Sequence, residues 1–138
     1  MKPMRIHHIG VVLPTMEKAK SYMEKMGLET DYTGYVEAYQ ADLIFTKYGQ
    51  YSCPIEFIVP RAGVLTEYNN GKGGIAHIAF EVEDVEAIRQ EFENKGLKML
   101  EKKAVQGTDD IIVNFCRPNF SEGILTEFVQ TIAPIKRD

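Results

Sequence analysis

Two stretches of the chain consist of apolar residues that alternate with polar ones or follow one another without interruption. In the segment after each stretch, the apolar residues recur with a longer period. Residues 6–13 and 75–82 carry the apolar runs, which predict β-strands. After each run, apolar residues recur every three to four positions, as on one face of an α-helix. The helical positions are Met16, Ala19, Met23 and Met26 in the first segment and Val85, Ile88 and Phe92 in the second.

Both predicted helices have start and stop signals. Thr15 and Asp84 stand where a side chain can cap the first backbone N–H groups. Gly27 and Gly96 stand where a left-handed residue ends a helix. Each segment is therefore predicted as strand followed by helix.

Three further strand-like runs follow each predicted helix, so each half of the chain reads as a βαβββ unit. The runs cover 28–36, 40–47 and 53–59 in the first half and 97–103, 110–116 and 123–130 in the second. The glycine- and asparagine-rich segment between the halves reads as a linker with a short helix near 64–68. We expect a single domain, 1–138, with module one at about 4–60, a linker at 61–74 and module two at about 75–131.

The second half of the chain repeats the first at a nearly constant offset. HIGVV at His8 aligns with HIAFE at His77, and 77 − 8 = 69. MGL and KGL, ahead of the next strands, keep this offset of 69. IEF around Glu56 aligns with TEF around Glu127, where 127 − 56 = 71. The matches predict two copies of one unit and an α+β fold with a curved eight-stranded sheet around a metal-binding concavity.

The repeat singles out four polar residues as candidate metal ligands. Because side chains alternate across a strand, His8 and His77 lie opposite the apolar residues expected to face the helices. Glu56 and Glu127 likewise point away from their apolar neighbours. A single histidine in a strand is more often structural, and we interpret His7 in that way because its counterpart is an alanine. The recurrence of His and Glu in both copies favours one divalent ion held by two imidazoles and two carboxylates, a set that zinc, nickel, cobalt, manganese and iron accept.

Composition narrows the functional classes. The 138 residues are 44% hydrophobic and 10% aromatic, enough for a packed core. A formal net charge of -4 argues against a nucleic-acid-binding surface. The start of the sequence lacks a signal-peptide core and no apolar run is long enough for a membrane span, so we expect a cytoplasmic protein without membrane or nucleic-acid partners. Cys53 and Cys116, without CxxC spacing, read as buried free thiols.

Four motifs carry a resemblance to a known family. They are HHIGVV at the start, IEFIVP at Glu56, GKGGIAHIAFEVEDVEA around His77 and FCRPNFSEGILTEF ending at Phe128. Together they resemble the vicinal-oxygen-chelate superfamily, which includes glyoxalases, bleomycin resistance proteins and dioxygenases, and within it most closely the methylmalonyl-CoA epimerase family. Arg117 departs from the family's usual histidine, and residues 105–110 replace a glycine-rich turn with an acidic one, which suits the phosphates of a CoA tail poorly.

The resemblance implies a chemistry. Members of this kind remove the proton next to a carbonyl group and stabilise the resulting enolate with a divalent metal. It implies Glu127 as the base and Glu56 as a second catalytic carboxylate, with Asp42 as a further candidate for proton transfer. It also implies a small-molecule substrate, an acyl-CoA or a glutathione adduct, and a homodimer. No organic cofactor is expected.

Three other functions share the fold. A glyoxalase I-like lactoylglutathione lyase would use the same four ligands. A non-catalytic drug-binding protein generally lacks them. A dioxygenase holds iron with two histidines and one carboxylate, whereas this chain has a second carboxylate.

Overall fold

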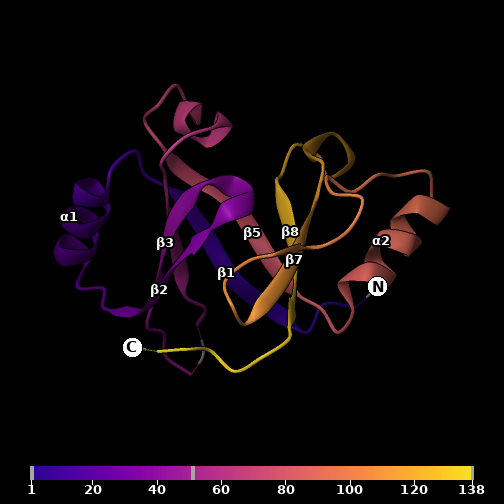
Figure 1. Cartoon of the computed structure of the whole chain (residues 1–138), viewed down its shortest axis with the longest axis horizontal. Helices are drawn as coiled ribbons and strands as arrows, with labels where there is room; N and C mark the ends of the chain where they lie inside the picture. The colour runs from indigo at the N-terminus through magenta and orange to yellow at the C-terminus, as the bar shows by residue number, and fades with distance from the viewer. Residues whose placement is uncertain (1, 51, 138) are drawn as a thin grey trace. The chain divides into compact units, whose positions relative to one another are not determined.

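The computed structural model describes residues 2–50 and 52–137, which divide into two compact units. The N-terminal unit comprises His8–Ala76 together with Arg137, and the C-terminal unit comprises residues 2–7 and His77–Lys136. Residues 2–7 join the C-terminal unit through contacts of Met4 and Arg5. There the N–H of Met4 donates to the carbonyl of Glu81 at 2.8 Å and the Arg5 side chain bonds the Glu81 carboxylate at 2.7 Å. Figure 1 labels both α-helices and most of the strands.

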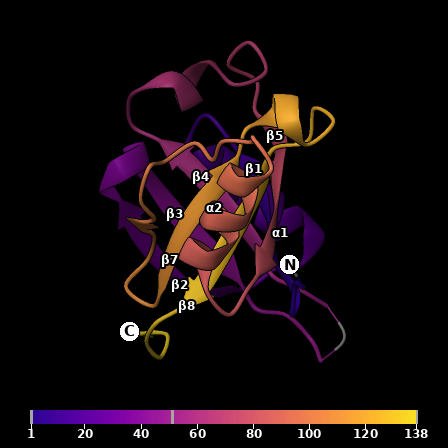
Figure 2. The ribbon, with the colours of Figure 1, turned by 90° about the vertical axis from the view of Figure 1, so that its right-hand side faces the viewer.

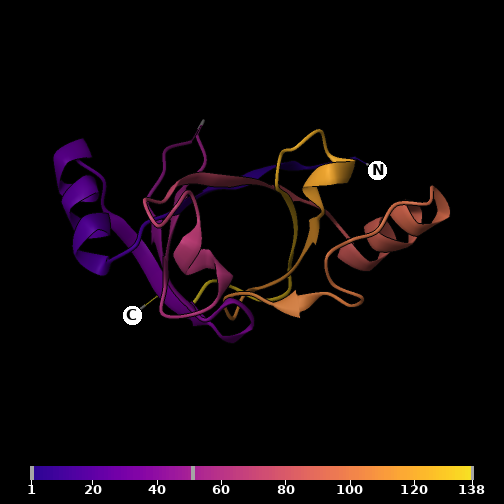
Figure 3. The same ribbon diagram turned by 90° about the horizontal axis from the view of Figure 1, so that it is seen from above.

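The N-terminal unit is a four-stranded sheet with one helix on it. Its strands are β1 (Arg5–Val12), whose first three residues belong to the C-terminal unit, β2 (Thr30–Val36), β3 (Ala41–Thr46) and β4 (Ile55–Pro60), in the order β2-β3-β4-β1. β1 and β4 are parallel, and the other pairs are antiparallel. Helix α1 (Met16–Met26) lies beside these strands (Figure 3). The core between helix and sheet contains Ala19, Met23, Ile44, Phe57 and Val59.

Helix α1 begins and ends where the sequence predicts. The Thr15 hydroxyl accepts a hydrogen bond from the N–H of Lys18 at 3.2 Å, which satisfies one of the unpaired donors of the first turn. Gly27 has φ 69°, a left-handed conformation that costs glycine little. The N–H of Leu28 then bonds the carbonyl of Met23 at 2.8 Å and closes the helix.

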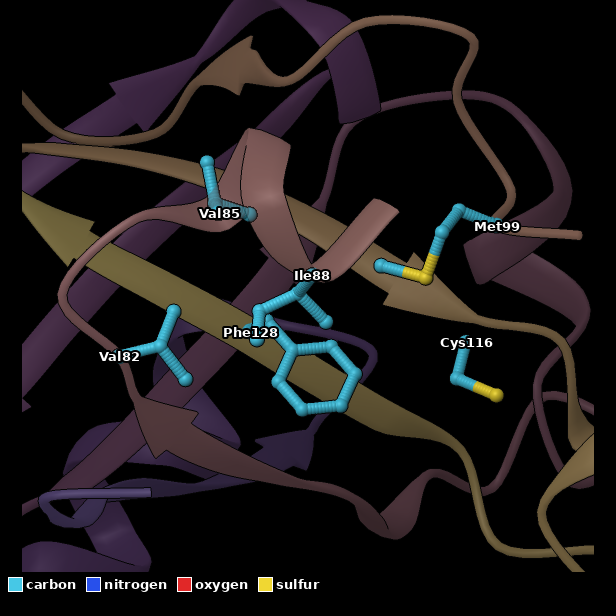
Figure 4. Close-up of a cluster of buried hydrophobic side chains, with 6 residues drawn as sticks. All are labelled: Val82, Val85, Ile88, Met99, Cys116 and Phe128. Atoms are coloured by element: carbon cyan, nitrogen blue, oxygen red, sulfur yellow. The ribbon is translucent and has the colours of Figure 1, made fainter. Parts of the chain in front are cut away.

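The C-terminal unit repeats this arrangement. Its strands are β5 (Gly74–Glu81), whose first residues belong to the N-terminal unit, β6 (Val105–Gln106), β7 (Ile111–Cys116) and β8 (Thr126–Thr131), in the order β5-β8-β7-β6. β5 and β8 are parallel. Helix α2 (Val85–Asn94) lies across β7 and β8 (Figure 2). The core beneath it contains Val82, Val85, Ile88, Met99, Cys116 and Phe128 (Figure 4).

The strand register of the two units is equivalent. Gly10 lies opposite Glu56 in the first parallel pair, and Ala79 lies opposite Glu127 in the second. These partners are related by the same offsets of 69 and 71 as the sequence motifs. The α+β class and the two βαβββ modules are therefore confirmed, with four strands in each module.

The predicted strand at 97–103 is wrong. In this segment only Met99 forms an isolated bridge, to Cys116. The buried Asn114 side chain accepts from the N–H of Glu101 and donates to its carbonyl, both at 3.0 Å, so an amide side chain takes the place of a backbone ladder. On the side of β7 away from β8, the strand that pairs with it is the two-residue β6 further along the chain.

The remaining short elements are 3₁₀ helices at Glu37–Tyr39, Val64–Glu67 and Pro118–Phe120. The second confirms the short helix predicted in the linker. Within residues 2–50 and 52–137, no helix combines the length and the apolar character needed to cross a membrane.

Gly73 should tolerate substitution less well than Gly96. Both have positive φ, 75° and 77°, but a Cβ on Gly73 would overlap the carbonyl oxygen of Val12, whereas a Cβ on Gly96 meets nothing within 4 Å. We expect Gly96→Ala to cost about 1–2 kcal/mol from conformation alone and Gly73→Ala to cost more, because the backbone must also move. Urea denaturation of both variants measures the difference. Equal losses would contradict the close approach at Gly73.

Candidate functional site

His8 and Glu56 form a buried pair in the N-terminal unit. Val11 and Leu13 pack towards α1, so alternation along the strand turns His8 to the other face. The same alternation in β4 separates Glu56 from Phe57, which contacts the helix. His8 Nε2 lies 3.3 Å from Glu56 Oε1, and the two residues are 0% and 6% exposed. The parallel pairing of β1 with β4 thus sets an imidazole beside a carboxylate.

His77 and Glu127 form the equivalent pair in the C-terminal unit. Phe80 and Val82 of the same segment pack towards α2, which leaves His77 on the opposite face. His77 Nε2 lies 3.1 Å from Glu127 Oε1, and each residue is 5% exposed. Each unit therefore holds one of the two His–Glu pairs that the sequence repeat predicts.

The chemistry of both pairs fits a divalent cation. Imidazole nitrogen and carboxylate oxygen bind first-row metals at about 2.0–2.2 Å, so two such donors at a right angle are about 3 Å apart. The observed separations of 3.1 and 3.3 Å match neighbouring ligand positions. Buried carboxylates also need a positive or hydrogen-bonding partner to offset lost hydration. That all four residues hold a single ion stays a prediction.

Asp42 is not a candidate for proton transfer at these pairs. It shares a face of β3 with Ile44, which packs against Met23 of α1, and it lines an open groove beside that helix. Arg61 donates to its two carboxylate oxygens at 2.9 and 2.7 Å. These hydrogen bonds lower the pKa of Asp42 below its usual value. Asp42 therefore forms an ion pair with Arg61 on the helix side of the sheet.

His7 is also buried, at 6% exposure. As the residue next to His8 in β1, it points to the other face of the strand. Its interpretation as a structural residue stays a prediction.

Sequence analysis missed an aromatic residue beside each histidine. Phe45 packs edge-on with the ring of His8, at a centroid distance of 5.3 Å and an interplanar angle of 84°. Phe115 does the same with His77, at 5.5 Å and 81°. The offset between the two phenylalanines, 115 − 45 = 70, falls between the offset of 69 for the histidines and the offset of 71 for the glutamates. Extending the repeat to the strands at 40–47 and 110–116 would have found them.

The amino-acid sequence is similar to a known protein family and to several known proteins. Residues 7–115 match the family described as the Glyoxalase/Bleomycin resistance protein/Dioxygenase superfamily. Mitochondrial methylmalonyl-CoA epimerase of Bos taurus is 26% identical over 131 residues, which cover 91% of this chain and 74% of that protein. The Homo sapiens protein of the same description is 24% identical over 131 residues, with 91% and 73% covered.

Solved structures of methylmalonyl-CoA epimerases have a fold similar to that of this chain. Methylmalonyl-CoA epimerase from Mycobacterium tuberculosis superposes with a TM-score of 0.86 at 18% identity, covering 95% of this chain and 90% of that one, a likeness of fold. A variant of Streptomyces coelicolor methylmalonyl-CoA epimerase, in complex with 2-nitronate-propionyl-CoA, gives a TM-score of 0.84 at 26% identity, with 96% and 100% covered. With a family match over most of its length and the same fold, this chain belongs to the glyoxalase/bleomycin resistance protein/dioxygenase superfamily.

Proposed function

We propose that this protein is a divalent-metal-dependent epimerase that removes and returns a proton next to the carbonyl group of an acyl thioester. The observation that carries the proposal is the buried His–Glu pair, present in both units at the same strand register. The similarity to methylmalonyl-CoA epimerases, including one in complex with a CoA-bearing compound, supports the substrate class.

In this proposal His8, Glu56, His77 and Glu127 are the ligands of one ion. Each of His8, His77 and Glu127 offers a donor atom that transition metals accept. The mixed nitrogen and oxygen set suits cobalt, nickel, zinc, manganese and iron alike, so it leaves the metal open. When bound, the ion supplies the positive charge that stabilises an oxyanion as it develops.

The chain itself must move the proton. A carboxylate is a weak base for a carbon acid, and Glu127 is our candidate because the resemblance to glyoxalase-type enzymes implies that role for the equivalent glutamate. It is almost fully buried, so water competes little for its oxygens. Epimerisation also needs a group that serves the opposite face of the carbon. We assign that role to Glu56, the residue at the equivalent register position of the other unit.

The acidic turn at residues 105–110 makes a glutathione adduct the alternative substrate. Asp110 is buried and accepts from the Thr108 hydroxyl at 2.5 Å, while Asp109 is exposed, with Lys136 at 3.5 Å from its carboxylate. Two carboxylates in this turn would repel the phosphates of a CoA tail if the substrate passed there. A glyoxalase I-like lyase handles a substrate without phosphates.

Assay of the purified protein tests the function directly. The protein is stripped with a chelator, reloaded separately with each of the five metals and assayed with methylmalonyl-CoA and with the methylglyoxal–glutathione hemithioacetal. We expect metal-dependent epimerisation of the thioester, with deuterium from D₂O entering at its α-carbon. Turnover of the hemithioacetal alone would favour the lyase. No metal-dependent turnover of either compound would contradict an enzyme of this type.

His8→Ala should weaken metal binding, because it removes a proposed ligand. Loss of a residue that merely supports a ligand costs about 10–100-fold in affinity, so loss of the ligand itself should cost at least as much. The matched control is His7→Ala, which removes the neighbouring buried imidazole from the other face of the strand. Calorimetric titration and elemental analysis measure both variants. Equal affinity in His8→Ala and the parent protein would remove His8 from the site.

Glu127→Gln should retain metal while losing turnover. Glutamine keeps an oxygen donor but cannot accept the substrate proton, and a missing general base costs roughly 10²–10⁴-fold in rate. Asp42→Asn is the control, because Asp42 lies on the helix side of its sheet, and we expect its turnover to match the parent. Deuterium incorporation at the α-carbon is followed beside metal content. Exchange at the parent rate by a metal-loaded Glu127→Gln variant would place the base elsewhere.

A further inference from the structure

We propose that Phe45 and Phe115 are positioning residues that hold the imidazole rings of His8 and His77 in the orientation required for metal binding. This inference rests on the proposed metal site. In both units the same kind of aromatic contact accompanies the histidine, and the set of ligands alone does not explain it.

The two phenylalanines occupy equivalent places in the sheets. In the N-terminal unit, Phe45 of β3 lies directly opposite Glu56 of β4. In the C-terminal unit, Phe115 of β7 lies directly opposite Glu127 of β8. Since β4 and β8 are the strands that pair with β1 and β5, each unit carries a row of His, Glu and Phe across three adjacent strands.

The contacts are edge-to-face in both rows. The ring centroids are 5.3 and 5.5 Å apart and the planes meet at 84° and 81°. Aromatic rings attract one another in this geometry because the positive edge of one meets the negative face of the other. The contact therefore depends on the angle of the imidazole plane, and turning the ring about its bond to Cβ would lose it.

The phenylalanines are themselves held in place. Phe45 is 1% exposed and stacks on Tyr32 of β2, with centroids 4.6 Å apart and planes within 7°. Phe115 is 8% exposed on β7, one of the two inner strands of its unit. Buried side chains packed in this way rarely change rotamer, so each can fix the ring that it touches.

Ring orientation matters for a metal ligand in a particular way. The lone pair of an imidazole nitrogen lies in the plane of the ring, so only one ring angle aims it at the ion. Groups around ligating histidines that set this angle commonly contribute about 10–100-fold to metal affinity. Phe45 and Phe115 are placed to do so through packing.

The test compares matched phenylalanine-to-leucine substitutions on the two faces of each sheet. Phe45→Leu and Phe115→Leu remove the rings beside the histidines. Phe57→Leu and Phe128→Leu are the controls, since these buried phenylalanines follow Glu56 and Glu127 but pack on the helix side. Co²⁺ titration followed by its visible absorption bands reports both affinity and coordination geometry.

We expect Phe45→Leu and Phe115→Leu to raise the Kd for Co²⁺ by about tenfold or more and to shift the absorption bands. The two controls should be less stable to urea but bind Co²⁺ with the Kd and spectrum of the parent. Unchanged binding in Phe45→Leu and Phe115→Leu, or equal weakening in the controls, would overturn the inference.

A second measurement separates this inference from the metal site itself. NMR of the metal-free protein reports the ring orientation of His8 and His77 through their contacts with neighbouring protons. A parent protein that binds no Co²⁺ would defeat the proposed function. In that case, loss of a single ring orientation in Phe45→Leu and Phe115→Leu would still support the positioning role, and retention of one orientation would defeat it too.

Discussion

The alternation of side chains along paired strands is the constraint on which the candidate site depends. Val11 of β1 and Phe80 of β5 pack towards a helix, and the residues of opposite parity in each strand face away from it. An apolar face towards the helix therefore forces His8 and His77 to the other face. Parallel pairing with β4 and β8 then sets a glutamate within 3.1–3.3 Å of each imidazole. A shift of one residue in either register would turn the polar residue of the slipped strand towards the helix-packed core and separate it from its partner.

Burial of these polar groups has an energetic cost, which charged or hydrogen-bonding partners must offset. Carboxylates at 5–6% exposure lose most of their hydration, and the neighbouring imidazole is one partner that each of them keeps. A protein that keeps such a pair in each of its two units is maintaining an arrangement that packing would not favour. In the proposed function a divalent cation is a further partner, since imidazoles and carboxylates are donors that such an ion accepts.

The two units are copies that have diverged in their edge strands. β2 is a seven-residue strand and contributes Tyr32 to the stack on Phe45. Its counterpart after α2 is reduced to the two-residue β6, and the Asn114 amide binds Glu101 where strand pairing would otherwise continue. The strands that carry His and Glu kept the same register in both units. The two units thus differ at their edge strands but agree in the register of the strands that carry His and Glu.

The internal repeat, the positions of both helices and the four candidate ligands could all be predicted from the sequence. They depend on local signals: Thr15 and Asp84 as caps, Gly27 and Gly96 at the ends, and the parity of His8 and His77 relative to apolar neighbours. The structure of residues 97–103 could not be predicted from the sequence. There the side-chain amide of Asn114, more than ten residues away, binds the backbone of Glu101 in place of a paired strand. The ion pair of Asp42 with Arg61 could not be predicted either, because the two residues lie on different segments of the chain. The same holds for the contacts of Phe45 and Phe115 with histidine rings on other strands. Periodicity determines which face a residue occupies, but only the tertiary structure decides which neighbour it meets there.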